Sequence, residues 1–330
     1  MPDHAAPITP PARPRTTGSR LARLQQALVL GSMAFTLVWL LYWWPRSPVL
    51  AVVGALLSLG GYALVLGLEG LAAARLNRLD AAPPAGWRGL ASAWWQEVRV
   101  APVVFAWRQP FRWASLPDDS EPSHSITPAV VFVHGFVCNR GLWLPWMRRL
   151  RNEGVPYVSV NLEPVFGDID DYVPQISDAV RRAHALTGRP PMLVCHSMGG
   201  LVARAWRVVE PDTPVHRVVT IGSPHRGTWL GRFSRVANGR QMRLDGDWLR
   251  ELQAREVQIA PTDTYADFVC WYSNADNIVF PASTATLPGA DNRLVPGAAH
   301  VAMAFHPRVM DESLAMVASA ASSPSERTVS

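Results

Sequence analysis

Two long runs of apolar residues without a charge dominate the first hundred positions. Residues 27–44 form the first run, residues 49–68 form the second, and the turn Pro-Arg-Ser-Pro at 45–48 joins them. A helix that crosses a bilayer needs about 20 apolar residues, with about 17 as the lower limit. Both runs reach this length. The pattern therefore predicts two transmembrane helices joined as a hairpin over residues 24–70, after a basic leader over residues 1–23.

Arginines near these runs predict the orientation of the hairpin. Arg20 and Arg23 precede the first run, Arg75 and Arg78 follow the second, and Arg46 lies between them. Because positive residues favour the cytoplasmic side, we expect a bacterial inner-membrane protein whose remaining chain is cytoplasmic. The alternative is a cleaved signal peptide. Its apolar core would have about 7 to 15 residues, which is shorter than the first run, and no small-x-small cleavage site precedes the second run.

A different pattern begins near residue 126, where short apolar runs alternate with amphipathic helical patterns. Strands are predicted at AVVFVHG, YVSVNL, PMLVC, HRVVTIG, DFVCWYSNAD and NRLVPG. This alternation is typical of a mostly parallel sheet with crossover helices. The predicted fold class is therefore α/β, with one domain over residues 126–321 and a flexible tail over 322–330. Residues 71–125 are predicted to form a linker, with an edge strand within 98–105.

Charge is unevenly distributed along the 330 residues. All 31 basic residues are arginines, the acidic residues number 26, and the formal net charge is +5. Residues 1–100 hold nine of the arginines and four of the acidic residues, so the α/β domain that follows is close to neutral. Proteins that bind nucleic acid present a clustered basic face on their folded part. We therefore expect no nucleic-acid partner.

The stretch LVCHSMGG at 193–200 places candidate chemistry at the turn between a predicted strand and a predicted helix. Its Ser-x-Gly matches the second half of G-x-S-x-G, a strained turn that holds a nucleophilic serine above a sheet. Ser197 is then the nucleophile, and the N–H of Met198 is a donor to an oxyanion. An isolated Ser-x-Gly is also typical of an ordinary helix start. Cys195 ends an apolar strand, where cysteine behaves as a small buried hydrophobic residue.

Two further strings accompany this turn, VHGF at 133–136 and GSPHRGT at 222–228. Together, and in this order, the three strings resemble the α/β-hydrolase superfamily, in particular its bacterial lipases and esterases. The resemblance covers residues 126–310 and implies an α/β-hydrolase fold, preceded here by the transmembrane hairpin. It also implies that the N–H of Phe136 is the second oxyanion donor. Cys195 stands where the family usually has the first glycine of its motif.

An activated serine needs a histidine base and an acid that orients the base, in the chain order serine, acid, histidine for this fold. Asp276 ends the predicted strand DFVCWYSNAD, and the run ADNIVFP resembles the sequence that follows the family's acid. His300 follows the last predicted strand through a Gly/Ala loop. The alternatives are Asp291, in a loop or turn, and His306, which precedes a proline at a predicted helix start.

Other polar motifs predict supporting roles. His134 and His225 belong to the loop motifs and are expected to be structural hydrogen-bonding groups near the site. The sequence has no H-E-x-x-H, no paired cysteine spacing and no lysine for a phosphate loop, so we expect neither a metal nor a cofactor. The insertion at 228–264 mixes tryptophans and leucines with arginines. It is either an amphipathic lid that faces acyl chains or anionic head groups, or a solvated helix pair with a few buried anchors.

These features predict a membrane-anchored serine hydrolase that cleaves carboxylic esters, lipid or acyl esters in particular, through Ser197, His300 and Asp276. Its expected partners are membrane lipids and the acyl-ester substrate. A thioesterase or an acyltransferase would use the same groups, because only the leaving group or the acceptor differs. A protein of another class is a membrane binding module whose hydrolase-like domain is inactive. The competent residue types at all three positions argue against it.

Overall fold

The computed structural model describes residues 18–122, 125–260 and 262–320. The predicted tail at 322–330 and most of the predicted leader at 1–23 lie outside these residues. The element bounds of the sheet are β1 (Val130–Val133), β2 (Tyr157–Ser159), β3 (Met192–His196), β4 (Arg217–Ile221), β5 (Phe268–Tyr272) and β6 (Asp291–Leu294). All neighbouring strands pair in parallel in the order β2-β1-β3-β4-β5-β6.

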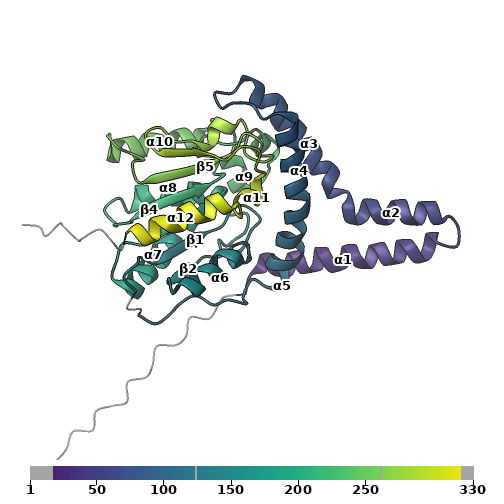
Figure 1. Cartoon of the computed structure of the whole chain (residues 1–330), viewed down its shortest axis with the longest axis horizontal. Helices are drawn as coiled ribbons and strands as arrows, with labels where there is room; N and C mark the ends of the chain where they lie inside the picture. The colour runs from purple at the N-terminus through teal and green to yellow at the C-terminus, as the bar shows by residue number, and fades with distance from the viewer. Residues whose placement is uncertain (1–17, 123–124, 261, 321–330) are drawn as a thin grey trace, which may run out of the picture.

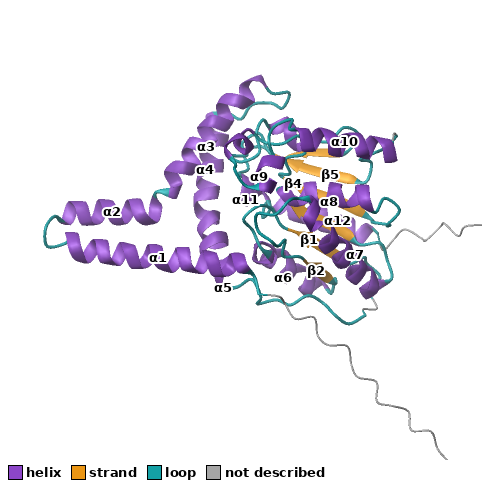
Figure 2. Ribbon diagram, turned by 180° about the vertical axis from the view of Figure 1, so that it is seen from behind, coloured by secondary structure: helices purple, strands orange, loops and turns teal. Residues whose placement is uncertain are grey.

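Helices cover both faces of this sheet (Figure 2). One face packs against α6 (Leu144–Glu153) and α12 (Pro307–Ser319), and the other packs against α7 (Val173–Thr187), α8 (Met198–Val209) and α10 (Asp247–Ile259). Strand β1 shows why both faces are apolar. Val130 and Phe132 point into the first layer and Val131 and Val133 into the second, as the twofold repeat of a strand requires. The predicted α/β fold is confirmed.

The order of the strands fixes where a site can form. The chain leaves β1 for β2 at the edge and then crosses back to β3 on the other side of β1. In open parallel sheets, such a reversal leaves a crevice outside the carboxyl ends of the two central strands. Gly135 and Phe136 follow β1, and Ser197 follows β3. The fold therefore brings the two loop motifs together at one edge of the sheet.

Short helices complete this domain. They are η3 (Arg140–Trp143), η4 (Asp170–Tyr172), η5 (Trp229–Phe233), α9 (Ala237–Gln241), η6 (Ala282–Ala285) and α11 (His300–Met303). The insertion at 228–264 contains η5, α9 and α10. Helix α10 packs on α8 through Leu252 and through a buried ion pair, in which Arg204 Nη2 lies 2.6 Å from Glu256 Oε2. The C-terminal half of the insertion is therefore tied to the core of the domain.

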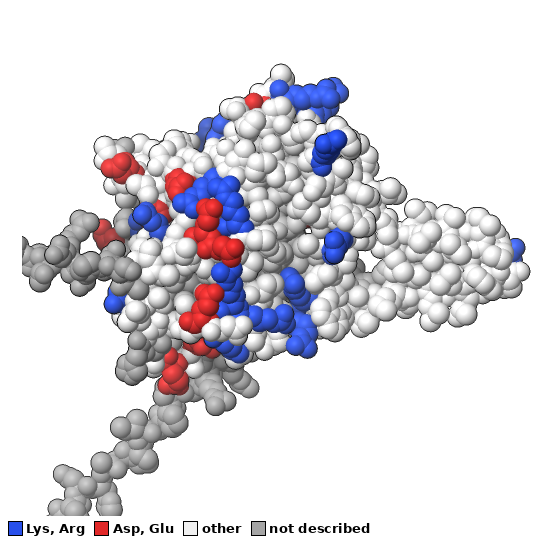
Figure 3. Space-filling view, viewed as in Figure 1, with Lys and Arg blue, Asp and Glu red and all other residues white. Residues whose placement is uncertain are grey.

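The N-terminal helices form a separate layer beside the domain. Helices α1 (Arg20–Trp43) and α2 (Pro48–Gly60) run antiparallel and project away from it (Figure 1). Thr36 Oγ1 and Ser58 Oγ lie 2.8 Å apart and join them by a hydrogen bond. Figure 3 shows this projecting hairpin without charged side chains along its length and with basic side chains at its tip and base.

The second apolar run is not one straight helix. It is divided between α2 and α3 (Tyr62–Leu76), which meet at a 54° bend. The bend falls at the pair Gly60 and Gly61, where two weak helix formers follow each other. Among the described residues, α1 alone is long and apolar enough to cross a membrane, and the bent pair would provide a second span if its two helices act together.

The edge strand predicted within residues 98–105 is wrong. This stretch is helical and belongs to α4 (Trp87–Ala101) and the π-helical η2 (Pro102–Arg108), after the short η1 (Asn77–Leu79) and before α5 (Gln109–Phe111). Its β-branched valines favoured a strand, but tertiary packing overrides such local preferences. The buried residues Ala93, Glu97 and Val104 recur at helical spacing, and α4 packs against α3 and α11.

Candidate active site

Ser197 occupies the apex of the turn between β3 and α8. Its φ of 54° and ψ of −127° lie in a region that L-residues rarely adopt, and its side chain is buried. The Ser197 N–H donates to Ile221 O at 2.9 Å, which fixes the turn to the end of β4. Strained backbone of this kind persists where the surrounding structure enforces it, and it concentrates at functional sites.

Two glycines allow the loops after β1 and β3 to touch. A Cβ atom on Gly199 would lie 2.5 Å from Val133 O, so only glycine fits against the end of β1. A Cβ atom on Gly135 would lie 2.7 Å from Ser197 Cβ and 3.3 Å from Ser197 Oγ. The Ser197 side chain is therefore in direct contact with the backbone of the VHGF loop.

The two predicted oxyanion donors lie on either side of this contact. Phe136 directly follows Gly135, and Met198 is the first residue of α8, where backbone N–H groups have no partner within the helix. Within the described part of the chain, neither N–H donates a hydrogen bond. Both N–H groups are therefore without a partner among the described residues, as the donors of the predicted oxyanion hole must be before a ligand binds.

The predicted acid and base are in contact with each other. His300 Nδ1 lies 2.9 Å from Asp276 Oδ2, and both side chains are almost fully buried. Asp276 Oδ1 accepts the N–H groups of Ile278 and Val279, each at 2.8 Å. These bonds fix the carboxylate so that it holds the proton of His300 on Nδ1 and leaves Nε2 as the acceptor.

Burial alone would lower the pKa of His300, but the charge and hydrogen bond of Asp276, together with Glu97 and Glu69, outweigh it and raise that pKa. The site is therefore suited to stabilise an imidazolium ion.

The end of β4 connects the serine to this pair. Gly222 follows Ile221, the residue bonded to the Ser197 N–H. A Cβ atom on Gly222 would lie 3.1 Å from Asp276 Oδ2 and 3.2 Å from His300 Nδ1. Among the described residues, no hydrogen bond joins Ser197 Oγ to the His300 ring. Such bonds are often long or absent without substrate.

The alternative residues lie elsewhere. Asp291 begins β6, is exposed and pairs with Arg293 at 2.6 Å. His306 precedes α12 as its N-cap, and neither residue contacts the Asp276–His300 pair. Cys195 is fully buried in β3, and burial raises the pKa of its thiol, so it is not a thiolate nucleophile at neutral pH.

The two loop histidines make internal hydrogen bonds. His134 Nε2 accepts the N–H of Leu162 at 2.9 Å, and burial lowers the pKa of His134 to about 4, so the ring is neutral. His225 Nε2 lies 3.0 Å from Thr220 Oγ1. The His134 ring thus holds backbone beside the site, whereas the His225 ring contacts the side chains of Thr220 and Cys270. In the described ranges, no group of three His, Cys, Asp or Glu side chains is arranged to hold a metal ion.

Three residues near His300 were not predicted from the sequence. The His196 and His300 rings have centroids 4.7 Å apart, Asn277 Oδ1 accepts the His300 N–H at 3.2 Å, and Glu97 accepts the next two N–H groups. Glu97 is the single acidic residue of α4, and the other charged residues of this helix are arginines. This lone acidic residue can be recognised in the sequence, but the sequence does not identify the groups that bind it.

Comparison with known proteins places the chain in a family. The model of the α/β hydrolase family matches residues 130–313, which is more than half of the chain, and the protein belongs to this family. The structure is similar to the mature lipase BlEst2 of Bacillus licheniformis, with 17% identity, a TM-score of 0.51, and coverage of 61% of this chain and 95% of that one.

Two other lipases show weaker similarity. Aspergillus fumigatus lipase B is 16% identical, with a TM-score of 0.48, and the match covers 58% of this chain and 53% of that one. Monoacylglycerol lipase of Paleococcus ferrophilus is 16% identical, with a TM-score of 0.42, and the match covers 59% of this chain and 96% of that one. No curated protein matches the sequence. The similarity to the Bacillus licheniformis lipase, at 17% identity, concerns the fold alone.

Proposed function

We propose that this protein is a membrane-anchored serine hydrolase that cleaves carboxylic esters, and lipid or acyl esters in particular. The observation that carries the proposal is the buried Asp276–His300 pair, with its 2.9 Å hydrogen bond, beside a serine on a strained strand-to-helix turn. A base that is oriented by an acid, next to a nucleophile, is the arrangement on which serine hydrolysis depends.

The proposed reaction has two stages. Ser197 Oγ attacks the ester carbonyl carbon while its proton passes to His300 Nε2, and Asp276 stabilises the resulting imidazolium. The N–H groups of Phe136 and Met198 stabilise the negative oxygen of the tetrahedral intermediate. The C–O bond to the alcohol breaks, and the alcohol leaves with the proton from His300. Water then attacks the acyl-enzyme with His300 as base, which releases the acid and restores Ser197.

The contacts of the hairpin support membrane anchoring. Leu41 in α1 and Leu56 in α2 are 68% and 67% exposed, and exposed apolar surface of this extent marks a membrane or protein contact. At one end, the Arg20 N–H donates to Glu163 of the hydrolase domain at 2.8 Å. At the other end, Asn77 Nδ2 donates to Asn274 O at 3.1 Å. Since both ends touch one domain, both belong on the same side of the membrane.

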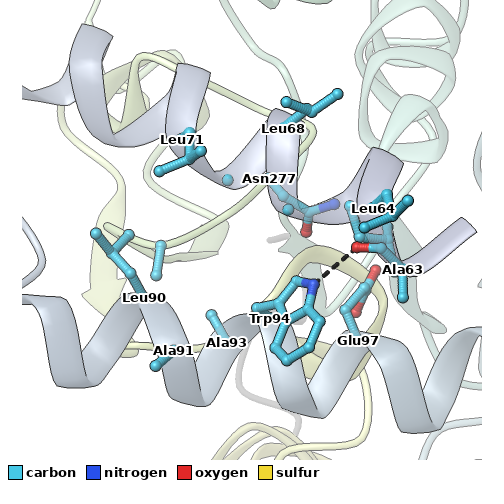
Figure 4. Close-up of a pocket in the computed structure, with 14 residues that line it drawn as sticks. Ala63, Leu64, Leu68, Leu71, Leu90, Ala91, Ala93, Trp94, Glu97 and Asn277 are labelled. Atoms are coloured by element: carbon cyan, nitrogen blue, oxygen red, sulfur yellow. Dashed lines mark hydrogen bonds between the residues drawn. The ribbon is translucent and has the colours of Figure 1, made fainter.

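An apolar cavity supports a lipid ester as substrate. It has a volume of about 400 Å³ and lies between α3 and α4, where Leu68, Leu90 and Trp94 line it (Figure 4). The lining also includes Asn277, next to the proposed acid. Ligand pockets have volumes of about 300 to 1,000 Å³ and are mostly apolar. A hydrocarbon chain that enters from the bilayer would meet this cavity beside the site.

A fluorophosphonate probe tests the proposal, because only an activated serine reacts with it. We expect the full-length protein to be labelled, Ser197→Ala to remain unlabelled, and the exposed Ser115→Ala to be labelled like the wild type. Labelling of Ser197→Ala would disprove the nucleophile, and an unlabelled wild type would favour a binding module. Hydrolysis of p-nitrophenyl esters of increasing chain length then measures the preference for acyl groups.

A further inference from the structure

We propose that helix α4 supplies a positioning residue, Glu97, which holds the turn that carries His300. The proposal rests on the function proposed above, in which His300 is the base. Helix α4 lies before residues 130–313, the part of the chain that the family model matches. A residue outside the family domain would then set the geometry of its active site.

Glu97 holds the turn with both oxygens of its carboxylate. Oε1 accepts the N–H of Val301 and Oε2 accepts the N–H of Ala302, each at 3.0 Å. The side chain is 3% exposed, and a buried carboxylate is costly unless it is hydrogen-bonded in this way. Glu97 therefore fixes the backbone immediately after His300, and the direction of the imidazole depends on that backbone.

Helix α3 holds the same turn from a second direction. Asn277 Oδ1 accepts the N–H of His300 at 3.2 Å, and Asn277 Nδ2 donates to Glu69 Oε2 in α3 at 3.0 Å. Three consecutive backbone N–H groups, those of His300, Val301 and Ala302, are thus bound by side chains. Asn277 also follows Asp276 directly, so the contact with α3 holds the acid loop and the base turn together.

Charge gives Glu97 an effect beyond position. The titratable groups that face His300 are Asp276 from the β5 loop, Glu97 from α4, Glu69 from α3 and His196 from β3. Burial lowers the pKa of His196, so it is neutral and adds no charge. Burial raises the pKa of Glu97 itself, whereas the N–H groups of Val301 and Ala302 and the charge of His300 favour its ionised form. When Glu97 is ionised, its negative charge is one of the contributions that raise the pKa of His300. Removal of this charge should therefore lower that pKa.

The test uses two variants of the full-length protein in detergent. In Glu97→Gln the amide oxygen accepts one N–H while the amide NH₂ faces the other, so one bond is lost together with the charge. We expect kcat to fall by about 10²-fold, the effect of a misplacement of about 1 Å, with KM unchanged. The acid limb of kcat/KM should also move to lower pH. Glu97→Asp keeps the charge, but its side chain is too short to accept both N–H groups. We therefore expect kcat to fall while the pH of the acid limb of kcat/KM does not change.

The matched control is Glu251→Gln, the same change at an exposed position of α10, and it should behave as the wild type in both measurements. A purely structural role for Glu97 would lower the melting temperature of Glu97→Gln while kcat and the acid limb of the folded enzyme stay at their wild-type values, and this result would overturn the proposal. A wild-type kcat in Glu97→Asp would also overturn the proposal. This variant provides the test if Glu97→Gln does not fold. An unlabelled wild type would instead contradict the proposed function itself.

Discussion

The imidazole of His196 lies against that of His300, with ring centroids 4.7 Å apart, and His196 Nε2 lies 3.3 Å from the His300 carbonyl oxygen. His196 directly precedes Ser197, so it connects the nucleophile turn to the base. It occupies the variable position just before the serine in the G-x-S-x-G pattern, and the sequence alone assigned it no role. Its position gives it a supporting role that can be tested.

His196→Phe keeps a ring against His300 and removes the hydrogen bond to the His300 carbonyl. A hydrogen bond contributes about 1 kcal/mol, so we expect kcat to fall by about tenfold or less. The acid limb of the pH profile should not move, because His196 is neutral at the pH of the assay. Steady-state kinetics across pH measures both quantities, and a shifted limb would show that His196 carries charge in the active enzyme.

Substitution of Asp276 and of Asp291 should show which of these two aspartates is the acid that orients His300. Asp276→Asn leaves the packing unchanged but holds the wrong tautomer of His300, and a loss of about 10⁴-fold in kcat is expected. Asp291→Asn removes an exposed ion pair with Arg293 and should change kcat little. Ester hydrolysis by the two variants decides between them. A severe loss in Asp291→Asn, with activity kept in Asp276→Asn, would assign the acid to β6.

The pH dependence should follow the protonation of His300. The base must be neutral to accept the proton of Ser197, so activity is lost as the pH falls through the pKa of His300. Because the carboxylates around His300 raise its pKa above the ordinary value of 6.5, the acid limb of kcat/KM should have its midpoint above 6.5. A midpoint below 6.5 would mean that burial outweighs these charges.

A buried ion pair should govern the stability of the insertion. Arg204 and Glu256 are both buried, and Glu256→Ala would leave the Arg204 guanidinium without its carboxylate. Loss of one partner of a buried pair costs about 3 to 5 kcal/mol of unfolding free energy. Urea unfolding, followed by tryptophan fluorescence, measures this change. The exposed Glu251→Ala serves as the control and should lie within about 0.5 kcal/mol of the wild type.

The hairpin should place both of its ends in the cytoplasm. Helix α2 has 13 residues, about 20 Å of helix, and cannot cross a hydrocarbon core of about 30 Å without part of α3. A reporter fused after Arg78 should fluoresce as a green-protein fusion and be inactive as an alkaline phosphatase fusion. The reverse pattern would mean that one segment spans the membrane and that the hydrolase domain lies in the periplasm.

The sequence was most informative where the pattern is local. Ser197 is recognisable because the strand, the turn and the glycine that the turn requires are adjacent in the chain, and the order of the strands then limits the acid and the base. The edge strand at 98–105 was mispredicted because the valines of α4 and η2 have a local preference for strands. The bend at Gly60 was missed because a pair of glycines weakens a helix without showing that it breaks.

Glu97 could not be assigned from the sequence for a different reason. Its partners are the backbone N–H groups of Val301 and Ala302. Almost every residue type has a backbone N–H group, so the sequence does not show which residues Glu97 binds. The contact also depends on how α4 packs against α11, and no short-range pattern specifies that arrangement. A single carboxylate in a helix whose other charged residues are arginines indicates only that some partner exists.

The contact between Glu97 and the turn at His300 has a consequence for the inheritance of this protein. A recombination event that joined residues 130–313 to another leader would transfer the serine, the acid and the base, but not the carboxylate that holds the base in place. Such a chimera would still match the family model, but its kcat would be lower because the turn that carries His300 would not be held. Selection should therefore preserve α3 and α4 together with the hydrolase domain as one heritable unit, even though the helices lie outside the family boundary.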